Sequence, residues 1–95
     1  MNAARGEATA RLAGAERTLC LTLGALAEIE TALGVEGLEA LADRMRRLSA
    51  KDLMLVLAAL LRGGGERELA ATLADAAVEP KAAAEAVAKA FAASL

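Results

Sequence analysis

The sequence contains no histidine, tryptophan or tyrosine, and it has one phenylalanine, one cysteine and one proline. Without histidine, the commonest general base and metal ligand is missing, so Ser-His-Asp and Cys-His nucleophile systems are excluded. The scarcity of aromatic rings also excludes the stacking platforms that bind single-stranded nucleic acids. The lone Cys20 cannot form an intramolecular disulfide, which fits a reducing compartment. The composition therefore predicts a non-enzymatic protein with no catalytic residues, no cofactor and no metal site.

Charge and apolar runs exclude two further classes of partner. Eleven basic and thirteen acidic residues give a net charge of -2, which is too balanced to predict binding to nucleic acid or to anionic lipid. The longest strongly apolar run, residues 53–61, is far shorter than the about 20 residues of a membrane span. No stretch near the first residue has the composition of a signal peptide. We therefore expect a cytoplasmic protein with no membrane partner, and residues 1–95 are enough for one domain.

The first part of the chain has the two-residue period of a β-hairpin. Apolar residues alternate with polar ones over residues 7–12, and again in the leucines Leu19, Leu21 and Leu23. Gly14 lies between the two stretches and supplies the positive φ that a tight turn needs. The pattern predicts a hairpin over residues 6–22 whose leucine face packs on helices. Its edges either accept another strand, from a partner or a second copy, or are protected by Arg11 and Arg17.

Four or five short helices are predicted to follow, over residues 23–95. The signals are a Thr22 cap with a Gly34 stop, a Ser49 cap with Asp52 three residues later, a glycine triplet, and Pro80 at a first helical position. The predicted helices span residues 23–33, 36–48, 50–62, 66–77 and 80–94. The third is apolar on all sides and belongs at the centre of the core. The fold class is therefore α+β, mostly α, with the hairpin packed on the helices.

Two of these helices carry apolar stripes at helical spacing, which we expect to face the core. One stripe is Leu38, Leu41, Ala42, Met45 and Leu48, and the other is Ala84, Val87, Ala88, Phe91 and Leu95. Half of the residues from 70 to 95 are alanine, which buries little area, so Phe91 is predicted to be the main anchor of the last two helices. Met45 and Met54 suit either the core or an adaptable binding surface.

Other clusters have structural interpretations beside functional ones. The triplet after Arg62 lacks the Lys-Ser/Thr of a phosphate loop and is predicted to be an interhelix loop. Glu28 and Glu30 diverge on a helix, which argues against a catalytic or metal-binding pair. Four basic residues cluster near the end of the second predicted helix: Arg44, Arg46, Arg47 and Lys51. They either contact an acidic partner or balance the partial negative charge at the C-terminus of that helix.

Five segments together resemble a known family. They are RGE at residues 5–7, LCLTLGALAEIE at 19–30, ALGV at 32–35, LSAKDL at 48–53 and LRGGG at 61–65. In this order and spacing they are similar to a small family encoded in gene transfer agent clusters, which make phage-like particles. The family lies among the tail genes and is described both as tail tube-related and as a tail assembly chaperone. The resemblance covers nearly the whole chain and is strongest over residues 19–34.

The resemblance implies a role in assembling long-tailed particles. A chaperone of this kind covers the apolar, helical tape-measure protein until tube subunits polymerise around it. The alternatives are a structural component of the tail or tail tube, and a generic helical interaction module. We expect tape-measure or tail tube proteins as partners, and homo-oligomers are an alternative. The expected location is cytoplasmic or particle-associated. The predicted partner-binding residues are Leu19, Leu21, Leu23, Leu26, Ile29 and Met45.

Overall fold

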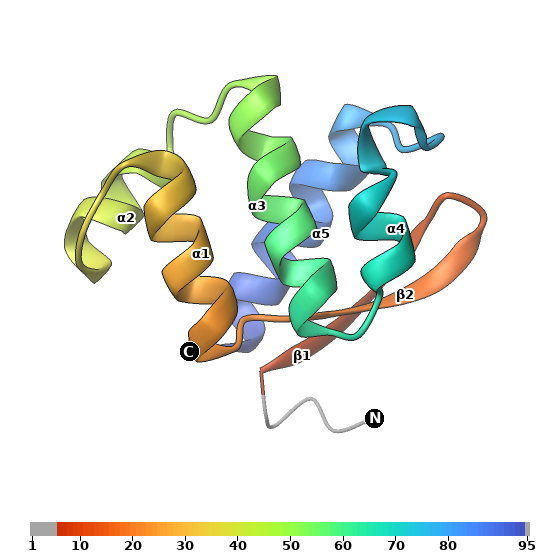
Figure 1. Cartoon of the computed structure of the whole chain (residues 1–95), viewed down its shortest axis with the longest axis horizontal. Coiled ribbons are helices and arrows are strands. Elements are labelled where there is room, and N and C mark those ends of the chain that lie inside the picture. Colours follow the sequence, from red (N-terminus) through yellow and green to blue (C-terminus); the bar gives the residue numbers. More distant parts are fainter. Residues whose placement is uncertain (1–5, 95) are drawn as a thin grey trace.

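A computed structural model describes residues 6–94 (Figure 1). A two-stranded hairpin precedes a group of short helices, which confirms the predicted α+β class with helix dominant. The elements in chain order are β1 (Glu7–Leu12), β2 (Ala15–Cys20), α1 (Leu23–Leu33), α2 (Leu38–Met45), α3 (Ala50–Gly63), α4 (Arg67–Ala71), the 3₁₀ helix η2 (Leu73–Asp75) and α5 (Pro80–Ala93).

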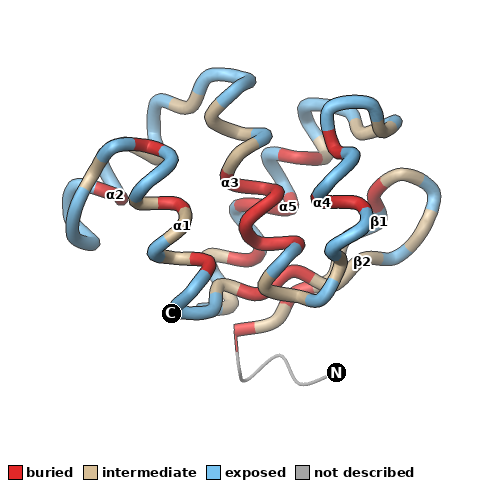
Figure 2. Tube along the Cα trace, in the orientation of Figure 1, coloured by how far each residue is buried: buried red, intermediate tan, exposed pale blue. Residues whose placement is uncertain are grey.

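Helix α3 lies at the centre of the fold, as its apolar sequence predicts. It packs against α1, α4, α5 and β2, and its residues 56–61 are buried (Figure 2). The Ser49 hydroxyl accepts a hydrogen bond from the Asp52 amide at 3.1 Å, and the Asp52 carboxylate accepts one from the Ser49 amide at 3.2 Å. This capping box satisfies amides that the first turn of a helix leaves without partners. The start of the central helix is therefore set by its own sequence.

The strands pair antiparallel, with Leu12 opposite Ala15 and Glu7 opposite Cys20. The hairpin is confirmed, but β2 ends at Cys20, and the leucine alternation continues past it. Thr22 Oγ1 accepts a hydrogen bond from the Ala25 amide at 3.0 Å, so this cap turns the chain into α1 at Leu23. Leu21 and Leu23 therefore lie beyond the end of β2 and do not belong to a leucine face of the strand.

The hairpin turn strains one residue. Ala13 has a φ of 53° and Gly14 a φ of 82°, and positive φ at both central residues is the requirement of a type I′ turn. A side chain with a Cβ costs about 1–2 kcal/mol in this conformation, and asparagine tolerates it better than alanine. We expect Ala13→Asn to raise the free energy of unfolding by about 0.5–1 kcal/mol, as measured by urea denaturation. Ala15→Asn is the control, because Ala15 lies in the strand, where asparagine is disfavoured. Equal stability of Ala13→Asn and the parent would contradict this account of the turn.

The outer edge of β2 is closed by the end of α3 and the residues after it. A Cβ on Gly63 would overlap the carbonyl oxygen of Cys20, and one on Gly64 would overlap that of Thr18. The Thr18 amide donates to Glu66 Oε2 at 2.9 Å. Strand addition at this edge is therefore blocked in the structure. The glycine run, which the sequence predicts only to be a loop, is the place where helix and strand backbones meet.

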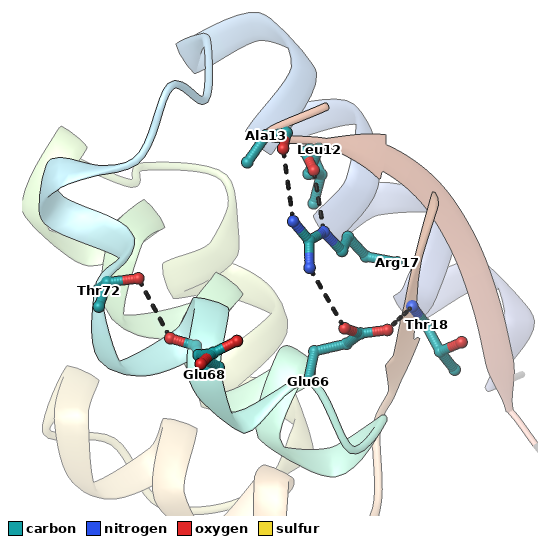
Figure 3. Close-up of polar contacts among 7 residues, drawn as sticks. All are labelled: Leu12, Ala13, Arg17, Thr18, Glu66, Glu68 and Thr72. Carbon is teal, nitrogen blue, oxygen red and sulfur yellow. Dashed lines mark hydrogen bonds and ion pairs between the residues drawn. The ribbon is translucent and has the colours of Figure 1, made fainter. Parts of the chain in front are cut away.

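Arg17 connects the hairpin turn to Glu66, which lies at the covered edge of β2 (Figure 3). Its Nε donates to the Leu12 carbonyl at 3.0 Å, its Nη2 donates to the Ala13 carbonyl at 3.4 Å, and its Nη1 lies 3.6 Å from Glu66 Oε1. One guanidinium thus holds the strained turn and the α3–α4 connection together. This contact is consistent with the edge-protecting role considered for Arg17.

Strand β1 lies against α5, which brings the two described ends of the chain together. Lys89 Nζ donates to the Thr9 carbonyl at 2.7 Å. At the start of the strand, a Cβ on Gly6 would lie 3.5 Å from Ser94 Oγ. Residues 6 and 94 are therefore neighbours in space.

Helix α1 ends as predicted, with Gly34 in the left-handed region at a φ of 70°. Helix α2 is shorter than the predicted 36–48, since it begins after Gly37 and ends at Met45. The predicted helix over 66–77 is also wrong in length, because it is interrupted at Thr72 and continues as η2. The last helix begins at Pro80 as predicted and ends at Ala93, one residue before the predicted end.

Candidate functional site

An open apolar groove of about 1110 Å³ lies between the start of α1, all of α2, the start of α3 and one face of α5. We call it the α1–α2–α5 groove. Its apolar lining is Leu21, Leu23, Leu26, Leu38, Leu41, Ala42, Met45, Leu48, Leu53, Ala84, Val87, Ala88 and Phe91, and its polar lining is Thr22, Arg46 and Ser94. Chemically, this surface can bury apolar groups, and it offers few polar groups to orient a small ligand.

Two leucines of the groove are unusually exposed. Leu23 has 83% of its surface accessible and Leu38 has 69%. Leu23 is the first residue of α1, where the cap fixes its position, and Leu38 is the first residue of α2. Large apolar side chains that gather on one exposed surface are typical of sites that bind a partner.

The groove exists because two predicted core stripes face the core only in part. On α2 only Leu41 is buried, and the rest of its stripe lines the groove. On α5 the buried residues are Ala83, Ala86, Val87 and Ala90, while Ala84 and Ala88 are exposed.

Phe91, the predicted anchor, is half-buried: it packs against the core and also lines the groove. The fully buried positions of α5 are mostly alanines, which allow the helix to lie close to α3 and β1. Leu95 lies outside the described residues.

The structure separates the six predicted partner-binding residues into two sets. Leu21, Leu23, Leu26 and Met45 line the groove. Leu19 and Ile29 have no exposed surface, so a partner cannot touch them, and they belong to the core. Strand periodicity placed Leu19 with Leu21 and Leu23, and helical spacing placed Ile29 with Leu26, but neither pattern indicates which residue is covered. The sequence did not predict that Leu38 and Phe91 lie at the same surface.

Comparison with known proteins gives the family. A family model described as phage tail tube protein, GTA-gp10, matches residues 5–95. The chain belongs to this family. No curated protein and no solved structure matches it significantly. The resemblance to tail proteins of gene transfer agents is thereby confirmed, and the groove is a feature of a phage tail protein.

Several polar residues that the sequence singled out have structural partners in this tail protein. Glu28 pairs with Arg62 and ties α1 to the end of α3. Glu30 Oε2 accepts a hydrogen bond from the Gly37 amide at 2.8 Å, which holds the connection to α2. Each carboxylate therefore serves its own connection. Among residues 6–94 there is no group of three or more potential metal ligands, and no helix there is long and apolar enough to cross a membrane.

Cys20 is a buried thiol beside the hairpin edge. Burial raises the pKa of the Cys20 thiol, and the negative charge of Glu7 raises this pKa further. A raised pKa reduces the thiolate fraction at neutral pH, so Cys20 is a poor nucleophile.

Asp52 connects the start of α3 to α2. Its Oδ2 accepts a hydrogen bond from Arg44 Nη2 at 2.6 Å. The hydrogen bond from Arg44, together with those from Ser49, holds the pKa of Asp52 below its ordinary value. The pKa of Asp52 is lower in the folded state than in the unfolded state, where it is about 3.9. The ionised carboxylate therefore stabilises the fold at pH values above about 3.9. This stabilisation is lost as the pH falls through the folded-state pKa.

We therefore expect Asp52→Asn to reduce stability at pH 7 and to make stability less dependent on pH below about 4. Asparagine keeps an oxygen that can accept from Ser49 but loses the charge that Arg44 binds. Urea midpoints between pH 2.5 and 7 measure the effect. Asp75→Asn, at an exposed aspartate outside this contact, is the matched control. If both variants change the pH profile equally, the Arg44 contact does not stabilise the fold.

Proposed function

We propose that this tail protein is an assembly chaperone that holds an apolar helix of the tape-measure protein in the α1–α2–α5 groove. The observation that carries the proposal is the pair of exposed leucines, Leu23 and Leu38, at one apolar groove. Leu21, Leu26 and Met45 line the same groove and are proposed as further contacts. In this mode, the apolar face of a partner helix enters a hydrophobic groove and is shielded from water.

The size of the groove is compatible with a helix. Its volume of about 1110 Å³ lies near the upper end of the roughly 300–1,000 Å³ range of pockets for small ligands. Three turns of helix, taken as a cylinder about 10 Å across, occupy roughly 1,300 Å³. The groove is open to solvent and is not an enclosed cavity, so a helix can approach it from outside.

Titration calorimetry tests the binding step directly. Overlapping helical segments of the tape-measure protein from the same gene cluster are added to the full chain. We expect at least one apolar segment to bind, with a negative heat-capacity change because apolar surface is buried. Failure of every segment to bind would overturn the chaperone proposal.

The second candidate is a component that remains in the tail tube, which the description of the family favours. Mass spectrometry of purified particles separates the two candidates. A chaperone is absent from particles, and deletion of its gene removes tails in electron micrographs. Presence in particles at a fixed stoichiometry would instead support the tube component.

A further inference from the structure

The apolar lining of the groove meets one charged residue, and it lies at the end of α2. Among the described lining residues, Arg46 alone carries a charge. Arg46 is the C-terminal cap of α2, and its side chain is 77% exposed. Its nearest carboxylate, Asp43, lies 3.6 Å from Arg46 and 3.0 Å from Arg47. Two guanidinium groups therefore share one carboxylate.

The surrounding segment has an excess of positive charge. Residues 43–52 include four basic side chains (Arg44, Arg46, Arg47 and Lys51) and two acidic ones, Asp43 and Asp52. Their sum is +2, whereas the whole chain has a net charge of -2. Asp52 is held by Arg44 at 2.6 Å. The excess charge therefore belongs to Arg46, which lines the groove, and to Arg47 and Lys51, which lie within five residues of it in sequence; all three are exposed. We call these three residues the basic rim.

We infer that the groove takes a helix with an apolar stripe and acidic side chains at the end that lies over the basic rim. This inference rests on the proposed function. Apolar contacts alone allow a helix to lie in the groove in either direction, because leucine and alanine side chains make similar contacts with both orientations of the helix. Carboxylates that meet Arg46 favour one direction, and complementary charge of this kind contributes more to specificity than to affinity. The basic rim thus sets the orientation of the partner.

Three designed peptides of about 15 residues test the inference. They share one leucine stripe and differ only in the last turn, which carries two glutamates, two glutamines or two lysines. Affinity for the full chain is measured by fluorescence anisotropy at low and high salt. We expect the glutamate peptide to bind about fivefold more tightly than the glutamine peptide, and the lysine peptide to bind most weakly. The difference should shrink at high salt.

Charge reversal provides the matched variants. Arg46→Glu is expected to reverse the order of the peptides. Arg67→Glu changes the chain's net charge equally, at an exposed residue of α4 outside the groove lining, and is expected to preserve the order. Equal affinity for the glutamate and glutamine peptides would overturn the inference and leave the groove function intact. If none of the peptides binds, the groove is not a helix site and the proposed function falls with it.

A second copy of the chain is the competing occupant. Sedimentation of the chain alone distinguishes it, because a dimer through the groove depends on concentration and is lost in Leu23→Asp. We expect a monomer at micromolar concentration. A dimer with this behaviour would overturn the assignment of the groove to a partner helix.

Discussion

Gly64→Ala is expected to lower the free energy of unfolding by about 3 kcal/mol or more. The added methyl group would overlap the Thr18 carbonyl oxygen on β2, so the end of α3 and the strand must move apart. Overpacking of this kind typically costs about 1–3 kcal/mol, and here the obstacle is backbone, which cannot rotate away. Gly64 has a φ of -89°, which alanine adopts freely, so the cost comes from steric overlap and not from backbone conformation.

Denaturation followed by circular dichroism measures this change. Gly24→Ala is the matched control, because Gly24 lies in α1 and its added methyl group would meet nothing closer than Thr22 Oγ1 at 3.9 Å. Alanine there favours helix by up to about 1 kcal/mol, so this variant should be slightly more stable than the parent. If Gly64→Ala unfolds and Gly24→Ala does not, the expectation is met. If Gly64→Ala is as stable as the parent, the close approach of α3 and β2 is contradicted.

The double variant Leu23→Asp/Leu38→Asp is expected to weaken partner binding at least about 100-fold with little change in stability. Each leucine is largely exposed in the free protein, so the fold does not depend on its burial. Covering a leucine with a partner contributes about 1.5–3 kcal/mol, so two lost leucines correspond to two or more factors of ten in affinity. An aspartate at residue 23 also suits the N-terminal end of α1.

Calorimetry with the tape-measure segment that binds best measures this loss. Met54→Asp is the control, because Met54 is an exposed apolar residue outside the groove lining. It should bind the segment as the parent does. Equal affinity of the double variant and the parent would place the binding surface elsewhere on the protein.

Local signals predicted most of the element boundaries. Thr22, Ser49, Gly34 and Pro80 each act through a neighbouring backbone group, so their effects are visible in a short window of sequence. The alternation at Leu21 and Leu23 was misleading because the Thr22 cap ends the strand pattern before them. The glycine triplet was incompletely explained, because its partner strand lies more than 40 residues away in sequence.

The groove could not be predicted because periodicity shows only that a helix has an apolar face. The stripe that includes Leu38 and the stripe that includes Phe91 look like core faces, and in most domains an apolar stripe faces the core. In α2 and in α5, part of the apolar stripe is buried in the core and the rest lines the groove. Which part is covered depends on how α2 and α5 pack as whole helices, which a short sequence window does not contain.

The neighbouring positions of Gly6 and Ser94 have a consequence for engineering. Ser94 also lines the groove, so a peptide fused after Ser94 through a flexible linker emerges beside the groove. Tethering raises the effective concentration of such a peptide to the millimolar range for a short linker. Weak apolar helices can then be captured as intramolecular complexes. The same proximity allows a circular permutant in which a short linker joins Ser94 to Gly6 and a new opening is made in the α1–α2 connection.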